Sequence, residues 1–402
     1  MTDDRLPIFQ TAKRQERNGK SMKILITTDL FTTATNGVVT SVRNLTDELK
    51  KKGHDVRILT LSDTVHSRKQ DHVYYIRSMP IGVYPNVRMS FASHHRLIRE
   101  LIEWKPDIIH SQCEFFTFRF ACRIARRTGA PIVNTYHTMY EQYVSYLVPG
   151  ERFGKWIVRT ASRYLLKKVN TVVVPTVKVE NTLRGYHIEQ PICVVPSGIS
   201  LEQFQSRLSP AIRKEKREAL GITDDQTVLI NLGRLGTEKN LSELVELFEK
   251  AIALHPDLRF LIVGDGPAKS DLEKLAEKLG IADRVIFTGM VSPTEVQNYY
   301  QLGDIFVSAS TSETQGLTYI EAAANALPLL CKEDPCLDGI ILQGENGYTY
   351  ANEAEFFEHL TDIQKTPDWK LRAGKRSESI ASIFDKRTFG DAIEKVYRSV
   401  LS

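Results

Sequence analysis

Short apolar runs alternate with longer segments of helical periodicity along most of the chain. The runs at 22–30 and 55–61 flank a segment, 38–53, whose apolar positions recur at helical spacing and which ends at Gly53. Further runs rich in β-branched residues follow at 106–112, 130–136, 171–176 and 191–199. Buried strands that alternate with helices in this way are typical of parallel sheets. The first half of the chain is therefore predicted to be an α/β domain.

The alternation restarts in the second half, after a polar stretch at 200–222 that we expect to hold the interdomain linker. Strands are expected at 226–235, 259–266, 284–291, 305–311 and 327–331. The whole pattern predicts two Rossmann-like domains, 22–200 and 201–385, whose parallel sheets face each other across a cleft. Residues 1–21 are expected to be a disordered lead-in, and 386–402 a terminal helix that is a candidate to cross back to the N-terminal domain.

Composition narrows the class of protein. The chain has 402 residues, 42% of them hydrophobic and 25% charged, as in soluble globular proteins. No stretch approaches the roughly 18–20 apolar residues that span a bilayer, and the polar N-terminus lacks the apolar centre of a signal peptide. Five irregularly spaced cysteines favour a reducing cytoplasm, and Cys331 and Cys336 lack the second pair that a zinc site needs.

The charge is divided unevenly between the two halves. Residues 1–200 carry 30 Lys and Arg against 17 Asp and Glu, a net of +13, whereas residues 201–402 carry 23 against 32, a net of −9. A basic half indicates an anionic partner, either nucleic acid or an anionic membrane surface. The chain shows neither aromatic stacking platforms nor a nucleic-acid-binding module, which favours the membrane.

Two glutamates, Glu313 and Glu321, stand eight residues apart near the C-terminus. Between them, Gly316 follows a polar turn, and a helix is expected from about Leu317, with Glu321 two turns down it. Free N–H groups and the helix dipole at such a terminus favour an anion. The structural alternative is an amphipathic core helix that follows a polar turn.

Other polar or glycine residues occupy the ends of predicted strands. They are Asn36 and Gly37, His137, Arg234, Glu238 and Lys239, and Gly264. In this order, and together with the Glu-x7-Glu pair, they resemble glycosyltransferase family 4 over about residues 22–400. The resemblance implies the GT-B architecture and transfer with retention of anomeric configuration. Many relatives carry two glycines where this chain has Asn36-Gly37, so the contacts of the first glycine stay unassigned.

Within that family, the segments YHTMYEQYV (136–144) and STSETQGLTYIEA (310–322) are similar to bacterial diacylglycerol glucosyltransferases. The resemblance implies transfer of glucose from UDP-glucose to diacylglycerol at the cytoplasmic membrane face, giving alpha-monoglucosyldiacylglycerol. Three alternatives stay open: galactose or a second glucose added to a glycolipid, transfer to a wall or capsule polysaccharide intermediate, and a non-catalytic sugar-nucleotide-binding protein. Glucose and galactose differ by one hydroxyl, which the sequence does not resolve.

The chemistry assigns expected roles. Arg234 and Lys239 would stabilise charge on the leaving diphosphate, so we expect no metal or other cofactor, and the sequence has no Asp-x-Asp pair. The N–H groups of Gly316 and Leu317 would add to this. By family resemblance, Glu321 would hold the ribose, Glu313 the transferred sugar and His137 its 6-hydroxyl. The remaining candidates are Gly37, Gly264 and Thr318 for the donor, and Glu114, Tyr140 and Tyr143 for the acceptor.

The segment 152–168 shows a divided face at helical spacing. Its basic side carries Arg152, Lys155, Arg159 and Arg163, and its apolar side carries Phe153, Trp156, Ile157, Ala161, Tyr164 and Leu165. This pattern is typical of a helix that lies in a membrane interface, as in a peripheral, monotopic protein. The alternative is a helix that packs its apolar side on the sheet and exposes a basic side.

Overall fold

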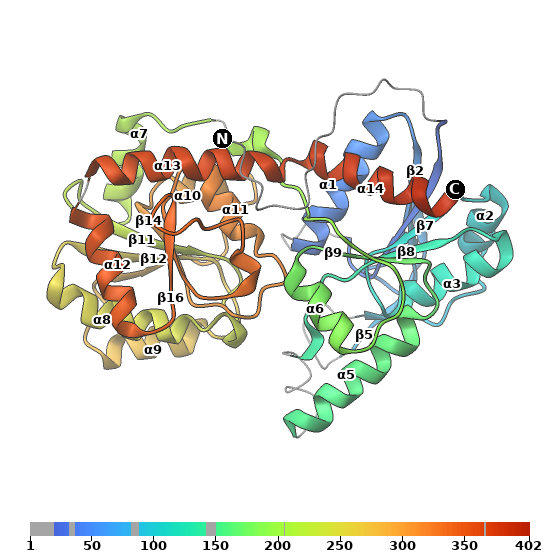
Figure 1. Ribbon diagram of the computed structural model, residues 1–402, viewed down its shortest axis with the longest axis horizontal. Coiled ribbons are helices and arrows are strands. Elements are labelled where there is room, and N and C mark those ends of the chain that lie inside the picture. Colours follow the sequence, from blue (N-terminus) through green and yellow to red (C-terminus); the bar gives the residue numbers. More distant parts are fainter. Residues whose placement is uncertain (1–19, 32–36, 82–87, 142–149, 205, 366) are drawn as a thin grey trace. The chain divides into compact units, whose positions relative to one another are not determined.

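The computed structural model describes residues 20–31, 37–81, 88–141, 150–204, 206–365 and 367–402. The chain divides into two compact units (Figure 1). Unit 1 contains Met1–Gly198 and Lys386–Ser402, and unit 2 contains Ile199–Asp385. The N-terminal unit therefore ends two residues before the expected boundary at residue 200, and the last helix of the chain belongs to it.

Unit 1 is built on an eight-stranded sheet with the order β10-β9-β8-β7-β1-β2-β4-β3. Its strands are β1 (Lys23–Thr28), β2 (Asp55–Leu61), β3 (Arg68–Gln70), β4 (Val73–Ile76), β7 (Ile108–Ser111), β8 (Ile132–Thr135), β9 (Thr171–Val174) and β10 (Ile192–Val194). Neighbours are parallel except β3 and β4. A separate antiparallel ribbon joins β5 (Met79–Pro80) to β6 (Arg88–Met89).

Helices cover both faces of this sheet. One face packs against α1 (Gly37–Lys51) and the C-terminal helix α14 (Lys386–Leu401), where Phe389 and Ile393 join Ile24 in one apolar cluster. The other face packs against α2 (Arg96–Trp104), α3 (Phe116–Thr128), α5 (Glu151–Leu166) and α6 (Val177–Gly185). The Tyr397 hydroxyl of α14 also lies 2.6 Å from the buried ring of His110 in β7. Apolar burial and this hydrogen bond explain why α14 belongs to unit 1.

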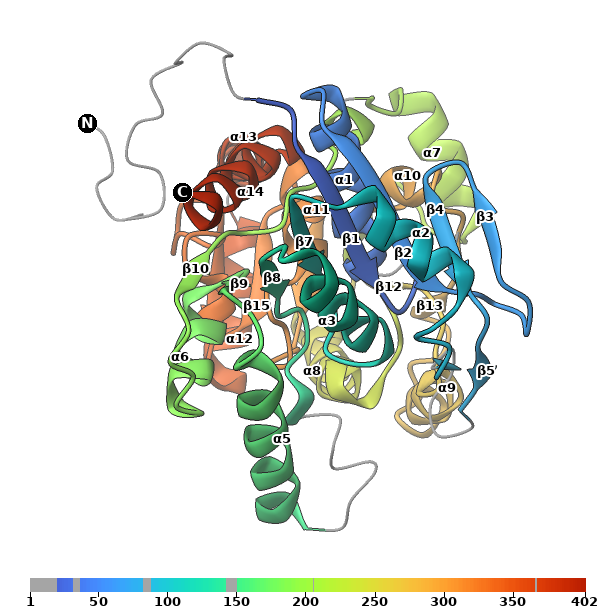
Figure 2. The same ribbon diagram turned by 90° about the vertical axis from the view of Figure 1, so that its right-hand side faces the viewer.

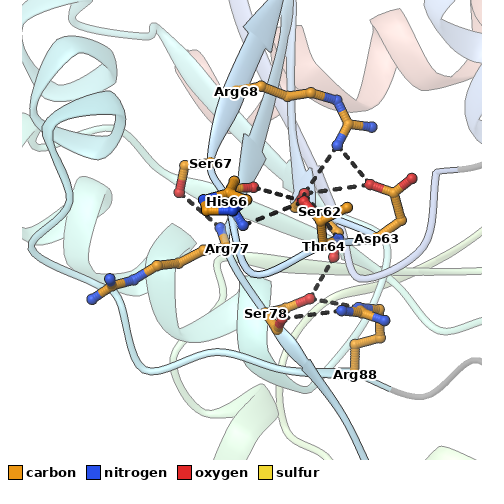
Figure 3. Close-up of polar contacts among 9 residues, drawn as sticks. All are labelled: Ser62, Asp63, Thr64, His66, Ser67, Arg68, Arg77, Ser78 and Arg88. Atoms are coloured by element: carbon orange, nitrogen blue, oxygen red, sulfur yellow. Dashed lines mark hydrogen bonds and ion pairs between the residues drawn. The ribbon is translucent and has the colours of Figure 1, made fainter.

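A polar network closes the end of β2 (Figure 3). Arg88 donates to the hydroxyl and the carbonyl of Ser78 at 2.6 and 3.0 Å, and the Ser78 hydroxyl donates to the Ser62 carbonyl. Arg68 donates to Ser62 and Asp63 at 3.0 and 2.6 Å. These contacts tie the β5–β6 ribbon and β3 to the sheet, so both arginines have structural partners.

Unit 2 is built on a six-stranded parallel sheet with the order β13-β12-β11-β14-β15-β16. Its strands are β11 (Thr227–Leu232), β12 (Leu258–Val263), β13 (Val285–Phe287), β14 (Ile305–Ser308), β15 (Leu329–Lys332) and β16 (Gly347–Tyr350). Its helices are α7 (Pro210–Ala219), α8 (Leu241–Leu254), α9 (Lys269–Lys278), α10 (Val296–Tyr300), α11 (Leu317–Ala324), α12 (Glu353–Lys365) and α13 (Pro367–Ala381). Separate apolar clusters fill the two faces.

The strands expected at the cores of both domains are confirmed, and the two-domain α/β class with them. The stretch 200–222, which was expected to hold the interdomain linker, contains a short 3₁₀ turn (Leu201–Phe204) and α7, and it belongs to unit 2. Arg217 of α7 is buried and donates to Asp304 at 3.1 Å, and Arg213 donates to the same carboxylate at 3.0 Å. The helix is thus held largely by ion pairs, which leave little apolar signal in the sequence.

The strand order places a topological switch point in each sheet. In unit 1, β1 lies between β2 and β7, and in unit 2, β11 lies between β12 and β14. Connections leave in opposite directions at such a point, and ligands of doubly wound sheets bind beside it, at the carboxyl ends of the strands. The loops that follow β1, β7, β11 and β14 are therefore where a site is expected.

Candidate active site

The switch point of unit 2 brings together two predicted residues that are far apart in sequence. Lys239 lies on a short 3₁₀ turn (Thr237–Lys239) in the loop after β11, and Glu313 lies in the loop after β14. The Lys239 ammonium lies 2.5 Å from Oε1 of Glu313, and the Ser310 hydroxyl donates to the same oxygen at 3.3 Å. Both charged side chains are partly exposed, so the pair is accessible to a ligand. The site thus combines a cation and a carboxylate side by side.

Arg234, in the same loop, forms an ion pair with Glu238. The Glu238 side chain is only 7% exposed, whereas the guanidinium-bearing side chain of Arg234 is 40% exposed. The sequence analysis placed Glu238 among the motif residues but gave it no role. Its buried position indicates that it orients Arg234, because a carboxylate held in place fixes the direction of a bound guanidinium.

Gly264, predicted as a donor contact, has a packing role in the structure. It has φ +134°, and a Cβ atom there would lie 1.9 Å from the Gly233 carbonyl oxygen. Only glycine permits this approach between the loops after β12 and β11. Gly264 therefore sets the path of the loop that carries Arg234, and its contact with a donor stays a prediction.

The predicted helix start is confirmed, because α11 begins at Leu317. Gly316 before it has φ +72°, and a Cβ atom there would lie 2.3 Å from the Tyr319 ring. The first-turn N–H groups, including those of Leu317 and Thr318, have no carbonyl partner within the helix itself. This terminus follows the Glu313 loop directly, which places it at the same switch point.

Glu321 lies four residues after Leu317, about one turn into α11. The expectation of two turns is wrong, because a turn takes about 3.6 residues and only four separate Glu321 from the start of the helix. Its Oε2 accepts a hydrogen bond of 2.9 Å from the Tyr300 hydroxyl. Burial raises the pKa of Glu321 to about 7, although the bond from Tyr300 opposes the shift. The carboxyl group is therefore poised to change its charge near neutral pH.

In unit 1, His137 follows β8, as predicted, and its Nε2 lies 2.7 Å from Oε1 of Gln112, which follows β7. Burial lowers the pKa of His137 to about 4, so the imidazole is neutral at pH 7. A neutral ring suits hydrogen bonding to a hydroxyl. Gln112 was not among the predicted site residues, because the expected strand 106–112 included it, whereas β7 ends at Ser111.

Glu114 and Tyr140 are also brought together. The Tyr140 hydroxyl donates to Oε2 of Glu114 at 2.5 Å. Burial raises the pKa of Glu114 to about 7, and the Tyr140 bond opposes this shift. Asp29, which the sequence analysis missed, follows β1 and accepts from the Phe116 and Thr117 N–H groups at 3.1 and 2.7 Å. It thereby caps α3 from across the switch point.

The remaining predicted residues lie at the edges of the described chain. Gly37 is the first residue of α1, whereas its neighbour Asn36 lies outside the described residues. Tyr143, predicted near the acceptor, also lies outside them. Neither Asn36 nor Tyr143 is therefore placed.

The helix α5 exposes aromatic side chains. Phe153, Trp156 and Tyr164 are 55%, 59% and 65% exposed, and the first two rings stack at 5.8 Å. The buried line of the helix is Gly154, Val158, Ser162 and Leu166. The alternative, that the apolar side packs on the sheet, is therefore wrong for these three aromatic residues. In both views the helix extends beyond the sheet (Figures 1 and 2).

The basic side chains flank this aromatic strip. Arg152, Lys155 and Arg159 are exposed and Arg163 is partly buried. Arg159 also donates to the Gly185 carbonyl at 3.1 Å, which holds it against α6. Among the described residues, no helix has both the length and the apolar character to cross a membrane.

Two Rossmann-like units, each with polar side chains at the carboxyl ends of its parallel strands, have the architecture of the GT-B fold. Solved structures share this fold: sucrose-phosphate synthase from Thermosynechococcus elongatus (TM-score 0.74, 19% identity, 94% of this chain and 98% of that one) and Anabaena HepE in complex with UDP and glucose (TM-score 0.73, 16% identity, 94% and 100%).

Sequence comparison gives the family. Residues 35–203 match "Glycosyltransferase Family 4" and residues 212–379 match "Glycosyl transferases group 1". Alpha-monoglucosyldiacylglycerol synthase of Streptococcus pneumoniae is 34% identical over 94% of this chain and 85% of the relative. The Acholeplasma laidlawii protein of the same name is 30% identical over 94% and 98%. The chain belongs to glycosyltransferase family 4, as the motifs indicated, and it is a glycosyltransferase similar to these glycolipid synthases.

Proposed function

We propose that the protein transfers glucose from UDP-glucose to diacylglycerol, with retention, at the cytoplasmic face of the membrane. The observation that carries the proposal is the Lys239–Glu313 pair at the switch point of unit 2, beside the N-terminus of α11. The names of the two relatives, both alpha-monoglucosyldiacylglycerol synthases, support glucose and diacylglycerol as the transferred sugar and the acceptor.

The donor end of this site suits a leaving diphosphate. Breaking the anomeric C–O bond leaves negative charge on the diphosphate, and fixed cations stabilise that charge more in the transition state than in the ground state. Arg234 and Lys239 already hold carboxylate partners in the structure. A diphosphate would offer each cation a second anionic partner. With these two charges in place, catalysis is proposed to need no divalent metal.

Each unit carries side chains that suit a sugar nucleotide. Glu313, kept beside Lys239, would accept hydrogen bonds from sugar hydroxyls and stabilise positive charge on the ring. The neutral His137 imidazole would bind the 6-hydroxyl, and Gln112 fixes its orientation at 2.7 Å. Glu321 would accept from the ribose hydroxyls while Tyr300 holds its other side. Retention of the anomeric configuration is proposed from membership of glycosyltransferase family 4.

The exposed strip on α5 supports docking on a membrane. Aromatic side chains prefer the membrane interface, and each Lys or Arg near an anionic surface adds roughly 1 kcal/mol of attraction. Phe153, Trp156 and Tyr164 are all more than half exposed, and basic side chains lie beside them. The enzyme is therefore proposed to be peripheral, with α5 lying in the interface.

A turnover assay with mixed acceptors tests the proposal. The full chain is incubated with radiolabelled UDP-glucose and phosphatidylglycerol vesicles that contain dioleoylglycerol, monoglucosyldiacylglycerol or neither, with labelled UDP-galactose in parallel. We expect label from UDP-glucose in monoglucosyldiacylglycerol, and an alpha linkage by NMR. If label appeared only in a diglucosyl lipid, the protein would add a second glucose. If only galactose were transferred, the donor would be UDP-galactose. Either result would contradict the proposed reaction. Binding of UDP-glucose with no transfer to any acceptor would indicate a non-catalytic protein.

A further inference from the structure

Three buried polar atoms belong to residues near the carboxyl ends of β7 and β8, which are neighbours in the sheet. Among the described residues, Oε1 of Glu114, Nε2 of Gln112 and Oδ1 of Asn134 have no hydrogen-bond partner. The three residues are at most 5% exposed. Buried polar groups are nearly always paired in native proteins, so an unpaired group of this kind indicates a ligand or a bound water.

The arrangement around Glu114 leaves one of its oxygens for a ligand. Oε2 is occupied by the Tyr140 hydroxyl at 2.5 Å. The nearby carboxylate of Asp29 is engaged by the N-terminus of α3 and by the Thr117 hydroxyl at 2.7 Å. The Asn134 side chain is close enough to lower the pKa of the same carboxyl group. Among the described residues, Oε1 of Glu114 still has no donor in hydrogen-bond geometry, so it is the acceptor that a hydroxyl would satisfy.

Two exposed phenylalanines, Phe91 and Phe115, belong to the segment that carries Glu114 or pack against it, and we call this pair the aromatic rim. Phe115 is 52% exposed and packs edge-on against the ring of Tyr140, with centroids 5.3 Å apart. Phe91 is 66% exposed, packs edge-on against Phe116 at 5.9 Å, and is covered on one side by the guanidinium of Arg119 at 5.7 Å. Exposed phenylalanine rings near a buried hydrogen-bond acceptor suit a ligand that joins an apolar body to a hydroxyl group.

We propose that Glu114 and Tyr140 form the binding site for the acceptor hydroxyl, and that Phe91 and Phe115 hold the apolar part of the same molecule. The occupant is a diacylglycerol, because a single free hydroxyl beside an apolar body matches a buried hydrogen-bond acceptor beside an aromatic rim. The inference rests on the proposed function and deepens it, since it assigns a subsite in unit 1. Glu114 is assigned to binding, as the group that accepts the hydroxyl hydrogen bond and orients the attacking oxygen.

The test separates acceptor binding from donor binding. In detergent micelles, we expect Glu114→Gln to raise the KM for dioleoylglycerol about tenfold, because the neutral amide oxygen of Gln accepts a hydrogen bond more weakly than a carboxylate does. The Kd for UDP-glucose, measured by calorimetry without acceptor, should change less than about twofold. Phe115→Ala should also raise the KM for dioleoylglycerol. The increase should be smaller for dioctanoylglycerol, because its shorter acyl chains make less contact with the rim.

Matched variants act as controls. Glu48→Gln replaces another buried glutamate of unit 1, which pairs with Lys51, and Leu254→Ala removes an exposed apolar side chain that has no proposed role. Both should leave the acceptor KM in micelles near that of the wild type. Phe115 is exposed, so its variant is expected to fold even if Glu114→Gln does not.

Two results would overturn the inference while the proposed function stands. One is wild-type turnover of diacylglycerol with an unchanged acceptor KM in both Glu114→Gln and Phe115→Ala. The other is a weaker Kd for UDP-glucose in Glu114→Gln with an unchanged acceptor KM, which would assign Glu114 to the donor. Failure of the wild type to use diacylglycerol at all would instead overturn the proposed function.

Discussion

Donor binding is predicted to depend on pH through Glu321. Burial raises the pKa of this carboxyl to about 7, and only its ionised form accepts hydrogen bonds from both ribose hydroxyls. About nine tenths of the groups are ionised at pH 8 and about one tenth at pH 6. If the complex requires the carboxylate, the Kd for UDP-glucose should rise roughly tenfold from pH 8 to pH 6, which corresponds to about 1.4 kcal/mol.

The sign follows from the direction of the shift. In the free protein, the carboxyl group of Glu321 becomes protonated as the pH falls through about 7. The complex requires the ionised form, so binding of UDP-glucose must lower the pKa of this group. Binding at pH 7 should therefore release about half a proton. The Glu321→Gln variant cannot titrate, so it should bind more weakly at pH 8 and show little pH dependence.

Isothermal titration calorimetry measures both quantities when it is run in buffers of different ionisation enthalpy. UDP-glucose suits the experiment because its diphosphate diester does not titrate between pH 6 and 8. The neutral His137, with its pKa lowered to about 4, does not contribute in this range. A constant Kd in the wild type, or an equal pH dependence in Glu321→Gln, would refute the assignment of Glu321 to the donor.

The remaining predictions concern the leaving group, the metal and the membrane. Lys239→Ala and Arg234→Ala should each lower kcat about 100-fold or more. Lys250 is an exposed lysine of unit 2 that pairs with Glu353, and Lys250→Ala is the control. If either active-site variant retained more than about a tenth of wild-type kcat, the phosphate role would be contradicted. Chelation with EDTA should leave turnover unchanged, and restoration of a lost activity by Mg²⁺ or Mn²⁺ would show that a metal is required. Co-sedimentation with vesicles should increase with phosphatidylglycerol content and decrease with salt, and equal binding to neutral vesicles would remove the electrostatic argument. Reversal of Arg152, Lys155, Arg159 and Arg163 to Glu should weaken vesicle binding with little change in the Kd for UDP-glucose, and unchanged vesicle binding would remove α5 from the membrane contact.

The sequence by itself determined the order and class of the elements. Apolar runs marked the central strands of both sheets because buried parallel strands are nearly continuous in hydrophobic residues. The start of α11 at Leu317 was also readable, since a glycine before a helical pattern is a local signal. The candidate residues His137, Arg234 and Lys239 were readable because they lie at the ends of strands, which are visible locally. Glu313 was readable from its spacing to Glu321.

Only the tertiary structure decided which of these residues meet. Lys239 and Glu313 are 74 residues apart, and they pair because β14 lies beside β11 in the sheet. His137 meets Gln112 because β8 lies beside β7. The order of parallel strands is a long-range choice that no local pattern encodes.

Burial was likewise decided in three dimensions. Helical spacing divided α5 into basic and apolar sides, but the pattern was equally compatible with an apolar side packed on the sheet. The structure buries the line that contains Val158 and Leu166 and leaves Phe153 and Trp156 in solvent. Similarly, the polar segment of α7 is folded because Asp304, far away in sequence, receives its buried Arg217. The spacing of residues determines which side chains share a face of a helix, whereas the neighbouring elements determine which face is buried against the core.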